Sequence, residues 1–262
     1  MDQPVSALAP PSAMVRFRCN ICGSDCECPR DRLDRETASC EGCGSTLRMR
    51  SIIGLLTREL FGELRPLGEL PVRKDIRGVG LSDWVEYATR LADVVDYRNT
   101  YYHQEPRLDI TDIGDDIAGS CDFIISTDVF EHVLPPVSKA FEGARRLLKP
   151  GGLLVMTVPY ALEFSHTLEH FPGLHEWCLE GDAVSGYRLR NMRRDGVEEV
   201  FDDLYFHGGP GSTLEMRLFS RDSLLAELRA AGFSEVRIAD EDLPEIGVHW
   251  PCQWSLPVLA RA

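Results

Sequence analysis

The sequence predicts an α/β protein with a doubly wound, largely parallel sheet, preceded by a small cysteine-rich module. The first observation behind this prediction is the stretch 122–159, which reads as buried strand, polar loop, amphipathic helix, tight turn and second buried strand. The second is a pair of Cys-x2-Cys motifs near the amino terminus. A chain of 262 residues with 44% hydrophobic residues is long enough for one α/β domain and a small appendage.

The stretch 122–159 is a β-α-β crossover unit. A short apolar run, Phe123-Ile124-Ile125, ends abruptly in polar residues, and residues 153–158 are apolar almost throughout, as in a strand covered on both faces. Between them, apolar residues recur at three- and four-residue steps and so share one helical face. These residues are Val137, Ala140, Phe141, Ala144, Leu147 and Leu148. Pro150-Gly151-Gly152 is expected to end the helix, because proline cannot continue it and glycine accepts the turn.

The sequence of this unit, DFIISTDVFEHVLPPVSKAFEGARRLLKPGGLLVMTVP, resembles class I S-adenosylmethionine-dependent methyltransferases. The resemblance covers residues 70–262 and implies a Rossmann-like, seven-stranded sheet, in which the strand ending at Thr127 is the fourth and residues 153–158 are the fifth. It implies S-adenosylmethionine as the cofactor, with part of the following loop lining the wall near the sulfonium. The loop residues concerned are Thr127, Asp128, Val129 and Phe130. Without this motif, the alternative is any doubly wound α/β protein.

The amino-terminal region divides into three predicted parts. Residues 1–15, rich in Pro, Ala and Ser, are expected to be a disordered leader. Residues 16–50 are expected to form a zinc ribbon, because the two Cys-x2-Cys motifs are separated by seventeen residues. The predicted Zn²⁺ ligands are Cys19, Cys22, Cys40 and Cys43. Residues 51–69 form a linking helix, in which Ser51 to Phe61 carries an apolar face and Gly62 is the stop signal.

A closed four-thiolate site is structural, since catalytic zinc keeps a position open for water. Cys26 and Cys28 are interpreted as spare reduced cysteines in the ribbon. A ligand exchange with Cys22, or a redox-active Cys-x2-Cys pair in place of zinc, are the alternatives.

The stretch 75–84 lies where the resemblance places the first glycine-rich loop. Gly78 and Gly80 are present, Ser82 stands where a third glycine often occurs, and Trp84 to Val95 is expected to be the following helix. The resemblance implies that Gly78, Gly80 and Asp83 hold the methionine end of the cofactor. A dinucleotide site would need a third glycine at position 83, so NAD is disfavoured.

The next segment departs from the family pattern, because it has no room for a helix between the second and third strands. We predict a second strand near Asn99 to Tyr102 and a third around Leu108 to Thr111. The resemblance places Asp109 opposite the adenine amino group, and Glu105 or Tyr101 in place of the usual ribose-binding acid. For Tyr101, strand packing is the alternative.

Residues 160–215 form a polar and aromatic insertion without strong periodicity, predicted to bind the substrate. Histidine is the usual general base near neutral pH, and the candidates here and in the preceding loop are His132, His170 and His207. Further on, Ser220 is expected to cap a helix closed by Gly232, followed by a strand through Ile238 and a terminal strand over residues 254–258.

The net charge of −14 argues against a nucleic-acid partner, because phosphate backbones are bound mainly by lysine and arginine. The sequence contains no apolar run of membrane-spanning length and no signal-peptide pattern, and the paired cysteines fit a metal site, so we expect a cytoplasmic protein without a membrane partner. The sequence does not decide whether the chain forms a homo-oligomer.

The leading hypothesis is methyl transfer from S-adenosylmethionine to a hydroxyl of a small-molecule, sugar or other natural-product acceptor. A second hypothesis is methylation of RNA or protein with the ribbon as recognition module, which the basic residues Arg48, Arg50 and Arg58 would allow. A third is a non-catalytic scaffold, suggested by the shortened glycine motif and the missing ribose acid.

Overall fold

The structure is a computed structural model that describes residues 13–262. The chain forms two compact units, one comprising residues up to Pro71 with Asp240–Cys252 and the other comprising Val72–Ala239 with Gln253–Ala262. Most of the predicted leader lies outside the described residues. Its last two positions, Met14 and Val15, already belong to the first strand.

The amino-terminal unit is built on a two-stranded antiparallel sheet. β1 (Met14–Arg18) pairs with β2 (Asp25–Pro29), with Phe17 opposite Cys26. Three single turns of 3-10 helix follow at Arg30–Arg32 (η1), Leu67–Glu69 (η2) and Pro244–Ile246 (η4). Phe17, Leu33, Leu47, Ile246 and other buried apolar side chains form the core of this unit, so the late segment 240–252 completes it.

Helix α1 (Leu47–Phe61) begins four residues before the predicted helix. Thr46 is its N-cap, since its hydroxyl accepts a hydrogen bond from the Met49 amide (3.4 Å). Gly62 ends it in the left-handed conformation (φ 74°), as its position in the sequence predicted.

The second unit contains a six-stranded sheet in the order β15-β16-β6-β5-β3-β4. Four neighbouring strands are parallel: β4 (Val95–Thr100), β3 (Arg73–Leu81), β5 (Cys121–Thr127) and β6 (Leu148–Thr157). β16 (Val258–Arg261) runs antiparallel to β6 and to β15 (Ser234–Ile238). The carboxyl ends of the parallel strands therefore meet at one edge, where α/β proteins bind ligands.

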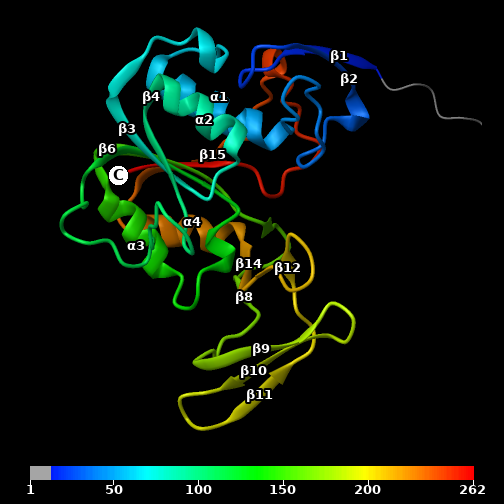
Figure 1. The fold of residues 1–262 in the computed structure, drawn as a ribbon, viewed down its shortest axis with the longest axis vertical. Helices are drawn as coiled ribbons and strands as arrows, with labels where there is room; N and C mark the ends of the chain where they lie inside the picture. Colours follow the sequence, from blue (N-terminus) through cyan, green and yellow to red (C-terminus); the bar gives the residue numbers. More distant parts are fainter. Residues whose placement is uncertain (1–12) are drawn as a thin grey trace, which may run out of the picture. The chain divides into compact units, whose positions relative to one another are not determined.

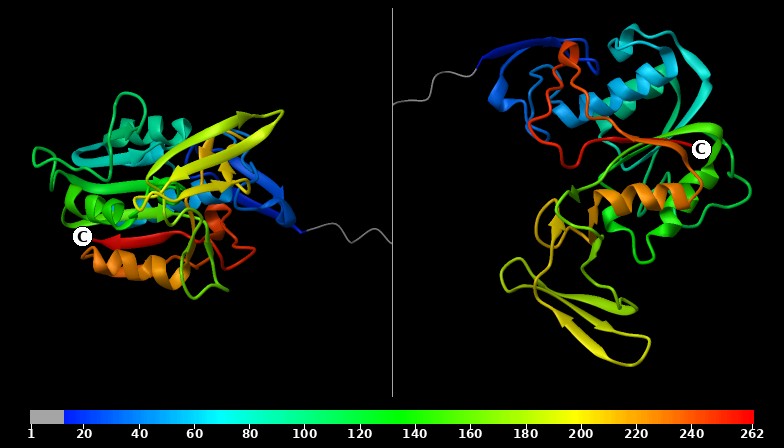
Figure 2. Two further views of the ribbon diagram at one scale, coloured as in Figure 1. Left: turned by 90° about the horizontal axis from the view of Figure 1, so that it is seen from below. Right: turned by 180° about the vertical axis from the view of Figure 1, so that it is seen from behind.

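Helices cover both faces of this sheet. Figure 1 shows α2 (Val85–Val94) on one face, and α3 (Ser138–Leu147) and α4 (Arg221–Ala230) on the other. The right-hand view of Figure 2 shows the same layering from behind. The six apolar residues that the periodicity assigned to one face of the helix 138–147 and its flanks are all buried. Ser220 caps α4, accepting a hydrogen bond from the Ser223 amide (3.1 Å).

The sheet has one strand fewer than the seven that were predicted. The expected third strand, Leu108 to Thr111, is a turn: Asp109 accepts hydrogen bonds from the Thr111 amide (2.9 Å) and hydroxyl (2.7 Å). Only a single parallel bridge, between Tyr101 and Arg107, extends the sheet here. The carbonyl of Ile110 packs onto α3 at Gly143, where a Cβ atom would collide with it.

Three other boundaries differ from the prediction. The second strand was expected near Asn99 to Tyr102, whereas β4 begins four residues earlier and ends at Thr100. α3 already ends at Leu147, and the chain enters β6 at Leu148, so Pro150-Gly151-Gly152 lies within the strand as an irregularity in its pairing with β5. The last strand begins at Val258, four residues later than expected.

The predicted substrate-binding segment forms β-structure. β9 (Glu176–Asp182), β10 (Gly186–Met192) and β11 (Glu198–Phe201) make a three-stranded antiparallel sheet, seen at the lower end of Figure 1. β14 (Arg217–Ser220) pairs with β7 (Tyr160–Ala161) and β8 (Leu168–Glu169), and β12 (Phe206–His207) pairs with β13 (Thr213–Leu214). A small core of Phe171, Leu189, Leu214 and Met216 supports them.

Candidate functional site

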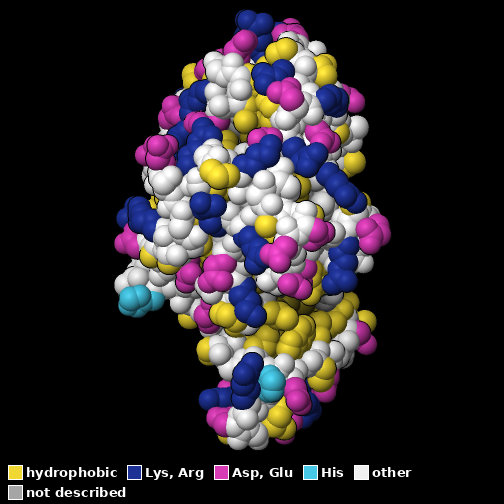
Figure 3. Space-filling model, turned by 90° about the vertical axis from the view of Figure 1, so that its left-hand side faces the viewer, with side chains coloured by type: hydrophobic (Ala, Val, Ile, Leu, Met, Phe, Trp, Pro, Cys, Tyr) yellow, Lys and Arg dark blue, Asp and Glu magenta, His cyan; other side chains and the backbone are white. Residues whose placement is uncertain are grey.

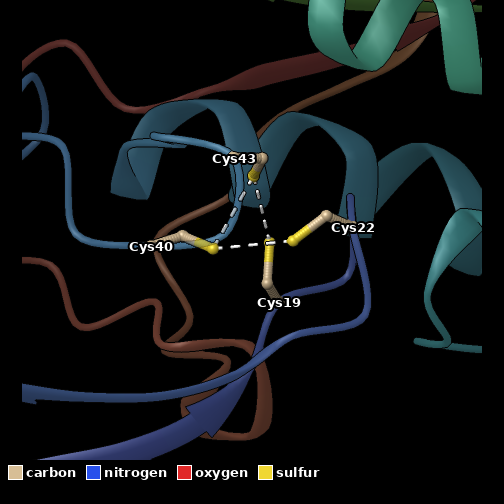
Figure 4. A group of neighbouring side chains, drawn as sticks. All are labelled: Cys19, Cys22, Cys40 and Cys43. Atoms are coloured by element: carbon tan, nitrogen blue, oxygen red, sulfur yellow. Dashed lines mark hydrogen bonds between the residues drawn. The ribbon is translucent and has the colours of Figure 1, made fainter.

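The four predicted zinc ligands converge in the amino-terminal unit. Figure 4 shows the sulfur atoms of Cys19, Cys22, Cys40 and Cys43 pointing toward one another from two turns. Each turn is closed by the same backbone bond: the Gly23 amide donates to the Cys19 carbonyl (2.8 Å), and the Gly44 amide donates to the Cys40 carbonyl (2.7 Å). Both glycines have positive φ (81° and 76°), which explains why glycine follows each motif.

The spacing of the sulfur atoms fits a tetrahedral metal site. The Sγ–Sγ distances are 3.8 Å for Cys19–Cys43, 3.6 Å for Cys22–Cys40 and 3.7 Å for Cys40–Cys43. Four sulfurs bound at about 2.3 Å to a tetrahedral zinc ion would lie about 3.8 Å apart. The four thiols and these three distances therefore fit a Zn²⁺ site.

A buried arginine lies beside the cysteine cluster. Arg50 has no exposed surface; it donates to the carbonyls of Ser45 (2.9 Å), Ile246 (2.7 Å) and Gly247 (3.0 Å), and its guanidinium lies 4.5 Å from the Phe17 ring. Burial lowers the pKa of Arg50, and nearby thiolates oppose that change. Its positive charge offsets part of the negative charge that four thiolates carry around one Zn²⁺.

The two remaining ribbon cysteines lie outside this four-sulfur group. Cys28 is packed in the apolar core of the unit. Cys26 lies opposite Phe17, and its thiol also contacts Cys40 of the four-sulfur group; burial, followed by this hydrogen bond, raises the pKa of Cys26 to about 12.

In the second unit, the predicted cofactor residues lie where β3 ends and α2 begins. Ser82 has φ 59°, so it takes the left-handed conformation that favours the glycine often found at this position. Asp83 is buried; its carboxylate accepts hydrogen bonds from the Tyr97 hydroxyl and from Thr127 at the end of β5 (3.4 Å). The ends of three parallel strands, β3, β4 and β5, are thus joined by side chains at one edge.

Asn99 is a residue at this edge that the sequence analysis missed. Its side-chain oxygen accepts from the Asp83 amide (2.9 Å), and its side-chain nitrogen donates to the Asp83 carbonyl (2.8 Å) and to the Tyr101 hydroxyl (3.2 Å). Asn99 thereby fixes the loop after β3 from the neighbouring strand. Asn99 could have been found from its position, because it lies near the end of the second strand, where the family resemblance places a ribose-binding acid.

Gly78 and Gly80 have a structural reason to be glycine. A Cβ atom on Gly78 would collide with the Phe123 ring, and one on Gly80 would collide with the Tyr97 hydroxyl and the Asp83 carboxylate. Tyr97 and Phe123 stack in parallel with centroids 5.9 Å apart. Packing therefore accounts for both glycines, and their contact with a cofactor stays a prediction.

The loop after β5 is held tightly. Asp128 takes a positive φ (52°) and is buried, and its carboxylate accepts a hydrogen bond from Thr157 at the end of β6 (2.8 Å). Phe130 has no exposed surface and packs edge to face on Phe141, with centroids 4.9 Å apart. It is therefore a core residue that anchors the 3-10 turn η3 (Phe130–His132), and Thr127 to Val129 are the loop residues left to face a ligand.

The residues predicted for adenine and ribose lie in the loop after β4. Asp109 forms the turn described above and is half-buried. The Tyr101 hydroxyl reaches Asn99 (3.2 Å), whereas the Glu105 carboxylate caps its own turn by accepting from the Arg107 amide (3.0 Å). Tyr101 is thus the one of the two that points toward the network at the end of β3.

Two of the three predicted histidines come together. The rings of His132 and His207 are nearly perpendicular, with centroids 5.5 Å apart, and Glu131 completes a group whose ligand-type atoms all lie within 4.8 Å of one another. His132 Nδ1 lies 3.0 Å from the Leu214 carbonyl, which can only accept, so Nδ1 carries the proton and Nε2 has a free lone pair. Burial lowers the pKa of His132, which keeps the ring neutral near neutral pH.

The third histidine lies apart from this pair. His170 stacks on Tyr205 with centroids 4.8 Å apart, and burial lowers its pKa. It does not belong to the group formed by Glu131, His132 and His207.

One short segment, residues 213–217, positions these side chains. Leu214 receives the His132 hydrogen bond, and the Met216 amide donates to the Glu131 carbonyl (2.8 Å), while the Met216 carbonyl accepts from the His170 amide (2.8 Å). Fully buried Arg217 donates to Glu169 (2.7 and 3.1 Å) and to the carbonyls of Phe130 (2.9 Å) and Val133 (2.7 Å). The sequence analysis singled out neither Glu131 nor Arg217.

A cavity of about 380 Å³ lies elsewhere in this unit, lined by Gly78, Arg98, Thr100, Leu108 and others. Gly78 is the only predicted site residue among its lining, so the cavity and the strand-end network are different places. Among residues 13–262, no helix combines the length and the apolar character needed to cross a bilayer.

Comparison with known proteins identifies the family. The family described as methyltransferase domain matches residues 62–238, more than half of the chain. No curated protein matches the sequence.

Solved structures with a similar fold include a 1,6-didemethyltoxoflavin-N1-methyltransferase from Burkholderia thailandensis (14% identity, 81% of this chain and 77% of that one, TM-score 0.43). They also include a sugar N-methyltransferase from a Streptoalloteichus species (14%, 80% and 85%, 0.44) and an S-adenosylmethionine-dependent methyltransferase from Clostridium acetobutylicum (12%, 71% and 82%, 0.40). The fold class predicted from the sequence is confirmed, apart from the missing strand. The chain belongs to the methyltransferase-domain family and is, as predicted, an S-adenosylmethionine-dependent methyltransferase of class I.

Proposed function

We propose that this enzyme methylates a hydroxyl group of a small-molecule, sugar or other natural-product acceptor. The observation that carries the proposal is the neutral imidazole of His132, whose Nε2 lone pair lies beside His207 directly after the fourth-strand loop. A hydroxyl must lose its proton as it attacks, whereas an amine can attack through its own lone pair. An unprotonated imidazole at this place therefore favours a hydroxyl acceptor.

The cofactor supplies a methyl group on a positively charged sulfur. The residues proposed to hold it are Asp83 and Tyr101 at the strand-end network, Asp109 for the adenine, and the loop Thr127 to Val129. The buried carboxylate of Asp83 and the rigid loop after β5 fit this task, because methyl transfer needs alignment more than it needs chemistry from the protein.

On the acceptor side, the insertion supplies apolar surface. Figure 3 shows apolar side chains gathered in a hollowed region on one face of the molecule. The insertion contributes several large exposed apolar side chains: Leu162, Phe164, Leu168, Trp177 and Tyr205. Exposed apolar side chains in this number are typical of a binding surface.

The basic residues that favoured an RNA acceptor are engaged within the protein. Arg50 is buried, Arg48 forms a two-point ion pair with Glu36 (2.8 and 2.8 Å), and Arg58 pairs with Glu241. In β10 and the residues after it, Arg188 pairs with Asp202 (2.7 Å) and Arg190 with Glu180 (3.1 Å). These pairs support a small acceptor over a phosphate backbone.

For the ribbon we propose a structural Zn²⁺ bound by the four clustered cysteines, which also suits a cytoplasmic location where thiols stay reduced. The test of the proposed reaction is release of S-adenosylhomocysteine when the zinc-replete enzyme and S-adenosylmethionine meet panels of hydroxylated natural products, free sugars, amines and bulk RNA. We expect turnover with a hydroxylated acceptor. Turnover confined to amines or RNA would contradict the proposal.

A further inference from the structure

We propose that Glu131, His132 and His207 bind one divalent transition-metal cation, separate from the zinc of the ribbon. Their donor atoms, one carboxylate oxygen and two imidazole nitrogens, lie within 4.8 Å of one another. Such a donor set suits Zn²⁺, Mn²⁺ or Fe²⁺ and contains no thiolate.

His132 is oriented as a metal ligand. Because its Nδ1–H donates to the Leu214 carbonyl (3.0 Å), the Nε2 lone pair is free, and Nε2 lies 3.7 Å from Oε1 of Glu131. Two ligands of a tetrahedral ion at about 2.1 Å would lie about 3.5 Å apart. A backbone carbonyl on the second ring nitrogen is the usual support of a metal-binding histidine.

Glu131 brings negative charge to a place from which water is excluded. Its side chain has no exposed surface, and its backbone carbonyl is fixed by the Met216 amide (2.8 Å). A cation at this position stabilises a buried carboxylate. Since Leu214 and Met216 are two residues apart, one segment fixes both Glu131 and His132.

His207 closes the site from the solvent side. It lies in β12 opposite Thr213, and its side chain is exposed, so it can move the short distance needed to join the other two ligands. Three protein ligands leave at least one coordination position open, as in catalytic rather than structural metal sites.

The neighbouring charges favour a cation. Glu215 is a half-buried carboxyl group close enough to His207 and Asp128 to interact electrostatically with both. Fully buried Arg217 is paired with Glu169. A divalent cation is attracted by carboxylates such as those of Glu131 and Glu215.

The inference rests on the proposed function and deepens it. What it keeps is the hydroxyl acceptor; what it changes is the role of His132, whose Nε2 lone pair would coordinate the cation instead of accepting the proton itself. The cation would hold the acceptor hydroxyl oxygen and lower its pKa. In the transfer, the bond from methyl carbon to acceptor oxygen forms as the bond from carbon to sulfur breaks. The hydroxyl proton passes to solvent water.

The experiment is a Mn²⁺ titration of the full-length protein whose ribbon is already loaded with zinc. Electron paramagnetic resonance measures the Mn²⁺ that stays free. The titration is repeated with Zn²⁺ and measured by calorimetry. His207→Ala removes a ligand at an exposed position, where folding is not at risk. Glu131→Gln removes the buried charge. His166→Ala, an exposed histidine of the same insertion outside the group, is the matched control.

We expect one cation per chain beyond the ribbon zinc, bound at least about tenfold more weakly by His207→Ala and by Glu131→Gln, and unchanged in His166→Ala. Binding of neither ion beyond the ribbon, or equal binding by wild type and His207→Ala, would overturn the inference. S-adenosylmethionine binding, measured on the same samples, shows separately whether the cofactor site is present.

Discussion

Arg217 of β14 binds two other segments, β8 and the turn η3, through its guanidinium group. It joins Glu169 of β8 to the carbonyls of Phe130 and Val133, the two ends of the turn that carries Glu131 and His132. All three of its nitrogen atoms donate, and its side chain has no exposed surface. The planar fork of arginine is needed for this geometry, which lysine cannot reproduce.

We expect Arg217→Gln to lower the free energy of unfolding by about 3 kcal/mol, because it leaves Glu169 and two carbonyls without a buried donor. Urea unfolding followed by circular dichroism measures the change. Arg221→Gln is the control, since Arg221 is exposed and pairs only with its neighbour Asp222 (3.2 Å), and it should change stability by less than about 0.5 kcal/mol. A loss below about 1 kcal/mol in Arg217→Gln would show that the turn does not depend on this group.

For single residues, the sequence predicts which side chains are candidates for the site better than it predicts what those side chains contact. His132 and His207 could be predicted as candidates, because histidine is the usual general base and both follow segments expected to face the acceptor. Which histidines meet could not be predicted, since five of the seven in the chain lie in the fourth-strand loop or the insertion. Glu131 and Arg217 could not be predicted as candidates, since their roles depend on backbone groups 80 or more residues away. The Glu131 carbonyl accepts from the Met216 amide, and Arg217 donates to the Phe130 carbonyl. The glycines show the converse: their positions were predicted, but aromatic packing explains them.

The two cysteine turns are the element that the sequence predicts most sharply. A Cys-x2-Cys turn closed by an i to i+4 backbone bond places both sulfurs on one side, and two such turns complete a tetrahedron. What spacing alone could not decide was the role of Cys26 and Cys28, which depends on the pairing of β1 with β2.

We expect Cys22→Ser to lose the bound zinc and, with it, protection of the α1 amides from hydrogen exchange, because this small unit depends on its metal to fold. Cys26→Ser should keep one zinc per chain. Elemental analysis of the purified variants gives the stoichiometry. Zinc loss in Cys26→Ser with retention in Cys22→Ser would mean that the two cysteines exchange roles.

Among the other elements, long periodic segments were predicted well and compact ones were not. α2 and α3 lie within a few residues of their predicted bounds, because their apolar spacing is regular. The third strand was wrong, because Asp109 and Thr111 close a turn through side-chain bonds that compete with strand pairing. The insertion folds into small antiparallel sheets whose register is set by pairing between strands, which no local pattern reveals.

For the whole molecule, the order of the parallel strands explains why the candidate residues meet. β4, β3, β5 and β6 lie side by side, so the residues that follow their carboxyl ends share one edge although they lie far apart in the sequence. Asp83, Asn99, Thr127 and Asp128 are linked to their neighbours at this edge by side-chain hydrogen bonds. We propose that S-adenosylmethionine binds at this edge.

Calorimetric titration of the zinc-replete protein with S-adenosylmethionine and S-adenosylhomocysteine shows whether the cofactor binds at this edge. We expect one molecule of either bound per chain, with binding weakened at least about tenfold in Asp109→Ala, which removes the predicted adenine contact. Asp112→Ala, an exposed acid three residues further on, should bind as the wild type does. Binding of neither compound, or equal binding by Asp109→Ala and wild type, would contradict the cofactor site described here.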